Sequence, residues 1–246
     1  MRLGLLSYIN SLPATFAIES GQLEHDCALL RAEPSELNRL ALAGELDVTA
    51  VSSVEYLRNR QLFELVPELC LGSDGPVRSV RLFSTLPLKE LQGKTVWMTG
   101  ASATSRALLL SLVPGVTALD APGEPSLDGR AAAVLRIGDR ALEEVAGADY
   151  VYDLGELWKQ TTGLPMVFAV WVARPGYLAQ ASRLLAASLA WGRANHDQVL
   201  DEATARTGLS RERLTDYFQC LSFTFDERAR QGLEEFGRRA LVKERV

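Results

Sequence analysis

Apolar and polar positions alternate in blocks along the first third of the chain, and each block has the period of a strand or a helix. Short apolar runs at residues 3–7, 27–32 and 47–51 predict three strands. Between them, residues 14–19 and 33–43 have helical spacing, and each helix ends just before a glycine. Strands that alternate with helices are typical of a mainly parallel sheet covered by helices.

The alternation restarts after a polar stretch at residues 72–79. This stretch leads into a strand over 80–84, and further strands are predicted over 95–99 and 131–137. The polar turn at 100–106 begins an apolar helix over 107–113. The second block of sequence therefore predicts another α/β unit.

The stretch that follows contains a strand that is apolar on both faces. A polar helix over 153–158 leads to the turn Gly163-Leu164-Pro165 and then to a strand over 166–173. Such a strand must be covered on both sides. From Tyr177 onward only helices with charged outer faces are expected. They span residues 178–196, 197–207, 210–221 and 226–242.

Two α/β units followed by a helical tail predict a two-lobed α/β protein of the type II periplasmic-binding-protein-like fold. We expect the chain to cross between the lobes near 76–88 and 164–175. Lobe 1 would contain residues 1–84 and 176–246, with the C-terminal helices packed on it, and lobe 2 would contain residues 85–175. Ligands of open α/β sheets bind at the carboxyl ends of the strands, so the cleft between the lobes is the expected site. A single doubly wound domain is the alternative.

Composition limits the kinds of partner. The chain has 246 residues, a net charge of −5 and 23% charged residues, which argues against a general affinity for nucleic acid. Cys27, Cys70 and Cys220 have no metal-ligand spacing and indicate reduced thiols. We expect no targeting segment, no membrane span and a cytoplasmic location. The oligomeric state does not follow from the sequence.

Five polar turns follow predicted strand ends and are expected to face the cleft. They lie at 7–10, 52–53, 73–79, 102–106 and 161–165. In the first of them, Asn10 offers both an amide donor and an acceptor, although a turn residue that bonds its own backbone is equally expected. The turn at 102–106 begins a helix and suits a carboxylate or phosphate, the alternative being an ordinary helix cap.

Other side chains have two interpretations each. Arg78 and Arg106 can pair with carboxylates, but most arginines are simply solvated. Tyr8 and Trp158 can form apolar walls or belong to the core. Asp139 is expected to cap a turn. The sequence contains none of the common motifs for metal, nucleotide or nucleophilic chemistry, so amides and hydroxyls are the expected working groups.

Six blocks in order resemble the chorismate dehydratase family of the futalosine route to menaquinone. The first is Ser7-Tyr8-Ile9-Asn10-Ser11-Leu12-Pro13, and the match extends over residues 2–175. The other blocks are residues 52–56, 73–80, 104–106, 137–142 and 162–169. The resemblance implies dehydration of chorismate, a dianionic small molecule, to 3-[(1-carboxyvinyl)oxy]benzoate without a metal or organic cofactor.

The resemblance and the turns together define the predicted site. Asn10 is the predicted catalytic residue, orienting the substrate while a carboxylate of the substrate itself removes the proton. The predicted substrate-binding residues are Ser7, Tyr8, Ser52, Ser53, Ser73, Gly75, Ser79, Ser102, Thr104, Ser105, Arg106 and Trp158. Two alternatives remain: a binding protein without catalysis, and the sister lyase that acts on cyclic de-hypoxanthine futalosine.

Overall fold

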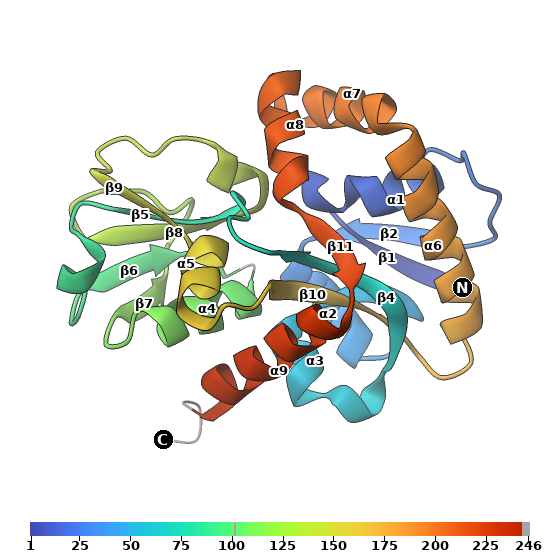
Figure 1. The fold of residues 1–246 in the computed structure, drawn as a ribbon, viewed down its shortest axis with the longest axis horizontal. Helices are drawn as coiled ribbons and strands as arrows, with labels where there is room; N and C mark the ends of the chain where they lie inside the picture. The colour runs from blue at the N-terminus through green and yellow to red at the C-terminus, as the bar shows by residue number, and fades with distance from the viewer. Residues whose placement is uncertain (101, 243–246) are drawn as a thin grey trace.

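The computed structural model describes residues 1–100 and 102–242, and it contains two separate β-sheets (Figure 1). Ala101 of the predicted polar turn and residues 243–246 of the predicted first lobe lie outside the described residues. The first sheet has the order β11 (Ser222–Phe225), β4 (Glu64–Ser73), β10 (Met166–Ala173), β3 (Val48–Ser52), β1 (Arg2–Leu6), β2 (Ala28–Ala32). The second has the order β7 (Thr117–Asp120), β6 (Thr95–Met98), β8 (Ala133–Ile137), β5 (Val80–Ser84), β9 (Tyr150–Asp153).

The first sheet mixes parallel and antiparallel pairs. Strand β1 is parallel to β2 and β3, whereas β10 is antiparallel to both of its neighbours, β3 and β4. Every residue of β3 is buried, and in β10 only Phe168 is partly exposed. This agrees with the apolar character of both strands, because helices cover the sheet on both sides (Figure 1).

Helices from both ends of the chain cover the first sheet. Helix α1 (Leu12–Glu19) packs against α6 (Leu178–Ala194), and α2 (Pro34–Leu42) packs against β3. Helices α3 (Ser53–Arg58) and α9 (Glu227–Val242) lie together on the other side of β10 from α1 and α6 (Figure 1). Helices α7 (His196–Thr207) and α8 (Arg211–Cys220) pack together near α1.

The second sheet shares a buried apolar cluster with the first, to which Val51 of β3 and Val170 of β10 also belong. Strand β5 is antiparallel to β8 and β9, and β6 is parallel to β7 and β8. Leu82 and Leu135 from neighbouring strands are fully buried with Leu108 of α4 (Ala103–Leu112) and Leu154 of α5 (Leu154–Thr162). Short 3₁₀ turns complete the chain: η1 (Ile9–Ser11), η2 (Arg60–Leu62), η3 (Leu88–Glu90) and η4 (Gly138–Leu142).

The chain crosses between the sheets twice, at shorter segments than predicted. It leaves the first sheet after Ser73 and joins the second at Val80, and it returns between Thr162 and Met166. The lobe boundaries predicted at residues 84 and 175 therefore place two strands, β5 and β10, in the wrong lobe. Strand β5 pairs with β8, and β10 pairs with β3, because hydrogen-bond pairing decides which sheet holds a strand.

The C-terminal tail also differs from the prediction in one respect. It is not purely helical, since β11 pairs antiparallel with β4 and extends the first sheet. Helix α9 contacts β10 and α3, and it also contacts α4 beside the second sheet. No helix in the described part of the chain is long and apolar enough to cross a membrane.

Candidate active site

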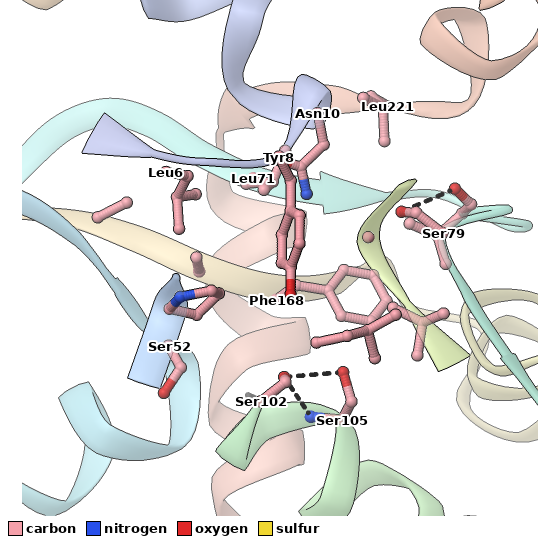
Figure 2. A pocket seen from close by; sticks show the side chains of 17 residues that line it. Leu6, Tyr8, Asn10, Ser52, Leu71, Ser79, Ser102, Ser105, Phe168 and Leu221 are labelled. Atoms are coloured by element: carbon pink, nitrogen blue, oxygen red, sulfur yellow. Dashed lines mark hydrogen bonds between the residues drawn. The ribbon is translucent and has the colours of Figure 1, made fainter. Parts of the chain in front are cut away.

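A cavity lies between the two sheets and is lined from both (Figure 2). Its empty space amounts to about 590 Å³, a figure that includes open solvent. The lining residues are Leu6, Tyr8, Asn10, Pro34, Ala50, Ser52, Leu71, Val77, Ser79, Val80, Ser102, Ser105, Ile137, Gly138, Phe168, Ala169 and Leu221. None of these side chains is charged, so a ligand here is held by neutral groups.

Asn10 projects into this cavity from η1, at the end of β1 (Figure 2). Its Oδ1 atom is buried and has no hydrogen-bond partner among the described residues. A buried polar atom without a partner costs free energy and requires an explanation. The prediction of a turn that satisfies its own amide is therefore not met, and Asn10 is available for a ligand.

Tyr8 forms one wall and is pressed against the second sheet. Gly138 has φ +59°, and a Cβ placed there would lie 2.7 Å from Cδ1 of Tyr8. Only glycine allows the ring to approach this closely in that backbone conformation. Burial and the nearby carboxylates of Glu33 and Asp139 raise the pKa of Tyr8 well above its usual value, so its hydroxyl is a neutral donor.

The N-terminus of α4 supplies the opposite wall (Figure 2). Ser102 caps the helix, with its Oγ accepting from the backbone N–H of Ser105 at 3.2 Å and donating to Ser105 Oγ at 2.9 Å. Both serines line the cavity. Hydroxyls beside the positive end of a helix favour a carboxylate.

Two further serines reach the cavity from different sheets. Ser52 is held by Asn38, which donates Nδ2 to Ser52 Oγ and accepts from the Ser52 backbone N–H, both at 3.0 Å. Ser79 follows Arg78, whose φ of +59° is unusual for a residue with a side chain. The Ser79 N–H donates to the Val77 carbonyl at 2.7 Å, which closes a tight γ-turn.

Several predicted hydroxyls are not on the cavity wall, because main-chain groups use them. Ser53 Oγ donates to the Val167 carbonyl at 2.7 Å, and Ser73 Oγ donates to the Gly75 carbonyl at 2.9 Å. Thr104 Oγ1 accepts from the Val54 N–H at 3.1 Å. These side chains fix the positions of the walls rather than line them.

The other predicted residues off the wall have structural contacts of their own. A Cβ on Gly155 would lie 2.6 Å from the Gly75 carbonyl, so Gly155 allows α5 to approach this turn, whereas Gly75 itself has φ +133°. Arg106 forms an ion pair with Asp120 at 2.7 Å. Trp158 is fully buried, and its Nε1–H donates to the Pro165 carbonyl at 3.1 Å.

Ser7 and the turn at 161–165 also lie outside the lining. The Ser7 N–H donates to the Ala32 carbonyl at 3.0 Å, continuing the pairing of β1 with β2. Thr162 Oγ1 donates to the Trp158 carbonyl at 2.8 Å at the end of α5. The fifth predicted turn therefore terminates a helix and does not contact the cavity.

Sequence reasoning named Tyr8 as a possible wall but missed Phe168, Leu221 and the contact that Asp139 makes across the cleft. Phe168 is the partly exposed residue of β10 because its ring faces the cavity, and its sequence context gives no sign of this. Leu221 comes from the tail, to which only packing was assigned. The sequence Ile137-Gly138-Asp139 places a glycine between a strand and an aspartate. This pattern was the available sign that the second sheet contributes to the cavity.

Asp139 connects the two sides of the cavity. Its Oδ1 accepts from the Ile9 backbone N–H at 3.1 Å, next to Asn10. Burial raises the pKa of Asp139 to about 6, and the Ile9 N–H, Arg206 and Arg140 oppose that increase. The predicted role as a local cap is replaced by a hydrogen bond across the cleft.

The fold is similar to that of several solved structures. A crystal structure of a protein from Archaeoglobus fulgidus matches with a TM-score of 0.82 and 20% identity, covering 100% of this chain and 98% of that chain. The periplasmic aliphatic sulphonate binding protein of Escherichia coli matches with a TM-score of 0.66 and 13% identity, covering 100% and 92%. The fold defines an α/β protein of the periplasmic-binding-protein-like class, as predicted, with a cavity between its two sheets.

Sequence comparisons identify the family within this fold class to which the chain belongs. The family model described as menaquinone biosynthesis matches residues 1–241. A chorismate dehydratase of Thermus thermophilus is 34% identical over 95% of this chain and 93% of that protein. A 1,4-dihydroxy-6-naphtoate synthase of the same organism is 27% identical over 82% and 77%. The chain belongs to the menaquinone biosynthesis family, and the predicted family resemblance is confirmed.

Proposed function

We propose that this chain is a chorismate dehydratase, a hydro-lyase that converts chorismate to 3-[(1-carboxyvinyl)oxy]benzoate and water. The observation that carries the proposal is the unpartnered Oδ1 atom of Asn10, a residue that lines a cavity together with serine hydroxyls and a helix N-terminus. The 34% identity to a chorismate dehydratase supports the same substrate. The cytoplasmic location expected from the sequence belongs to this proposal.

Chorismate suits a cavity without charged side chains. One substrate carboxylate lies at the N-terminus of α4, where Ser105 donates its hydroxyl hydrogen while accepting that of Ser102, and the helix dipole favours a negative charge. Arg106 stays in its ion pair with Asp120 outside this lining. Dehydration therefore depends on neutral donors that keep the dianion oriented.

No lining residue among those described is a carboxylate, imidazole or amine that removes a proton. We therefore assign the proton transfer to a carboxylate of the substrate, held in a near-attack geometry by the walls. The C–H bond breaks as that carboxylate takes the proton, the C–O bond of the ring hydroxyl breaks, the same carboxyl group passes the proton to the departing hydroxide to give water, and the ring becomes aromatic. The Asp139 carboxylate is adjacent, but it accepts from the Ile9 N–H across the cleft.

Asn10 orients the substrate at the reacting centre. Its amide supplies a donor and an acceptor in one planar group, and the buried Oδ1 gains a partner only when the substrate binds. Tyr8, pressed against Gly138, excludes water from the same space. Preorganised groups of this kind stabilise a transition state without the cost of reorganisation.

The test is to incubate purified protein separately with chorismate and with cyclic de-hypoxanthine futalosine, followed by chromatography and mass analysis. We expect an aromatic product lighter by one water from chorismate, and no reaction with the second compound. Turnover of the second compound alone would identify the sister reaction. Thermal stabilisation by chorismate without turnover would identify a binding protein.

A further inference from the structure

Tyr217 of α8 is a fully buried tyrosine whose hydroxyl is unused. The residue is 0% exposed, and its hydroxyl has no hydrogen-bond partner among the described residues. Its ring packs with Phe218 at a centroid distance of 5.5 Å and belongs to an apolar cluster that includes Ile9 and Leu142. Phenylalanine would fill this space without burying an unpaired hydroxyl, so the hydroxyl requires an explanation.

The polar group beside this hydroxyl belongs to the cavity. Asp216 and Arg78, the residues just before Tyr217 and Ser79, approach each other to 3.6 Å, so Tyr217 and Ser79 start from neighbouring backbone positions. Burial raises the pKa of Tyr217 well above its usual value, and the nearby Ser79 hydroxyl opposes that increase. Ser79 Oγ is turned toward the Val77 carbonyl, at the long distance of 3.4 Å. The Ser79 side chain lines the cavity, whereas Tyr217 does not. Tyr217 therefore lies on the side of Ser79 that faces away from the cavity.

The backbone that carries Ser79 is held rigidly. Asp153 accepts from the Val77 N–H at 3.0 Å and from the Arg78 N–H at 2.6 Å, and it also caps α5. Arg78 keeps a positive φ within this turn, a conformation that persists only where the surroundings impose it. With its backbone fixed, Ser79 retains one degree of freedom, the rotation of its hydroxyl about χ1.

Helix α8 meets this turn at more than one point. Asp216 lies 3.6 Å from the Arg78 guanidinium, and Leu221, just after the helix, lines the cavity. The tail of the chain is thus part of the site.

We infer that Tyr217 is a positioning residue that orients the Ser79 hydroxyl toward the substrate. When a ligand oxygen enters, Ser79 turns from the Val77 carbonyl, donates to the ligand and accepts the Tyr217 hydroxyl hydrogen. The unused hydroxyl of Tyr217 then has a partner, and the two hydroxyls act in series. This inference rests on the proposed function, since chorismate is the ligand that Ser79 would hold.

The test compares Tyr217→Phe, Ser79→Ala and the double variant by steady-state kinetics with chorismate and by thermal unfolding. Each single variant is expected to raise KM about tenfold, the effect of one hydrogen bond. Tyr217→Phe is expected to unfold at a temperature no lower than that of the wild type. In the Ser79→Ala background, loss of the Tyr217 hydroxyl should cause no further change.

Tyr56→Phe is the matched control, because Tyr56 is also buried but does not line the cavity. Its KM should equal that of the wild type. An unchanged KM in Tyr217→Phe or in Ser79→Ala, additive effects in the double variant, or a KM effect explained by lower stability would each overturn the inference. In each of those cases the wild type still turns over chorismate, so the proposed function stands. A wild type that neither binds nor converts chorismate would instead overturn the proposed function, and this inference with it.

Discussion

The ring of Tyr8 from the first sheet lies against the Cα atom of Gly138 from the second, so closely that a Cβ on Gly138 would be 2.7 Å from the ring. One residue further along each strand end, Asp139 accepts from the Ile9 N–H at 3.1 Å. These two adjacent contacts join η1 to η4 across the cavity and hold Asn10 at its place in the wall.

Gly138→Ala is expected to damage both stability and activity. The substitution places a side chain at φ +59°, which costs roughly 1–2 kcal/mol, and it also displaces the Tyr8 ring. Denaturant unfolding and KM for chorismate measure the two effects. Gly147→Ala is the control, because Gly147 has φ +81° with nothing within 4 Å of the added Cβ. It should lose comparable stability with unchanged KM, and a normal KM in Gly138→Ala would contradict the role given to this contact.

The second prediction concerns pH. The pKa of Asp139 is raised from 3.8 to about 6 in the folded protein, so the neutral form is favoured by folding. The stability contributed by this group is complete below about pH 4 and is lost as the pH rises through 6. The side chain introduced by Asp139→Asn is neutral at every pH, so this variant does not lose stability as the pH rises through 6.

The free energy of unfolding of Asp139→Asn, relative to wild type, should therefore increase by about 1–3 kcal/mol between pH 4 and pH 7. Denaturant titrations of both proteins at several pH values measure the difference. Taking the difference removes the contributions of Asp47 and Glu36, whose pKa values are lowered by their arginine partners. A difference that does not change with pH would show that Asp139 has an ordinary pKa.

Ser105 and Arg106 are neighbours with different expected roles. Ser105→Ala removes a hydroxyl from the cavity but keeps the N–H that Ser102 caps, so KM should rise about tenfold without loss of stability. Arg106→Gln should leave KM within about twofold, because its guanidinium pairs with Asp120 on an exposed surface. Steady-state kinetics decide, and an equal rise in KM for Arg106→Gln would place that guanidinium at the substrate.

Trp158 tests the difference between a core and a site residue. Trp158→Phe removes the hydrogen bond to the Pro165 carbonyl and part of the edge contact with Phe236, and should cost about 1–3 kcal/mol of stability. Because the ring is fully buried, KM for chorismate should not change. A raised KM in a fully folded variant would instead support the substrate contact that the sequence predicts for Trp158.

Local pattern predicted most of the elements but not their pairing, and it did not predict strands β4 and β11. The alternating strands and helices gave the α/β class correctly, since periodicity reports which faces are buried. Strands β5 and β10 were placed in the wrong units because a strand's sheet depends on distant partners. Strand β11 was missed because the four residues Ser222–Phe225 are too short to have a clear period between two helices.

The site was predictable at the level of turns and not of side chains. Asn10, Tyr8 and Ser79 stand on turns that the strand ends bring together, as expected. Ser53 and Ser73 occupy similar turns, but their hydroxyls bond main-chain carbonyls instead. Whether a serine hydroxyl bonds a main-chain carbonyl or faces the cavity depends on the rotation of its side chain, and the sequence does not carry that information.

The central claim is that the Asn10 amide orients chorismate for loss of water. The measurement is the rate of formation of the aromatic, dehydrated product by wild type and Asn10→Ala, with Asn59→Ala as control, since the Asn59 amide donates to the Glu55 carbonyl outside the cavity. We predict a loss of about a hundredfold or more in kcat for Asn10→Ala, with no loss of stability because its Oδ1 is unpaired. Asn59→Ala should turn over normally. A folded Asn10→Ala protein with near-normal turnover would contradict the account.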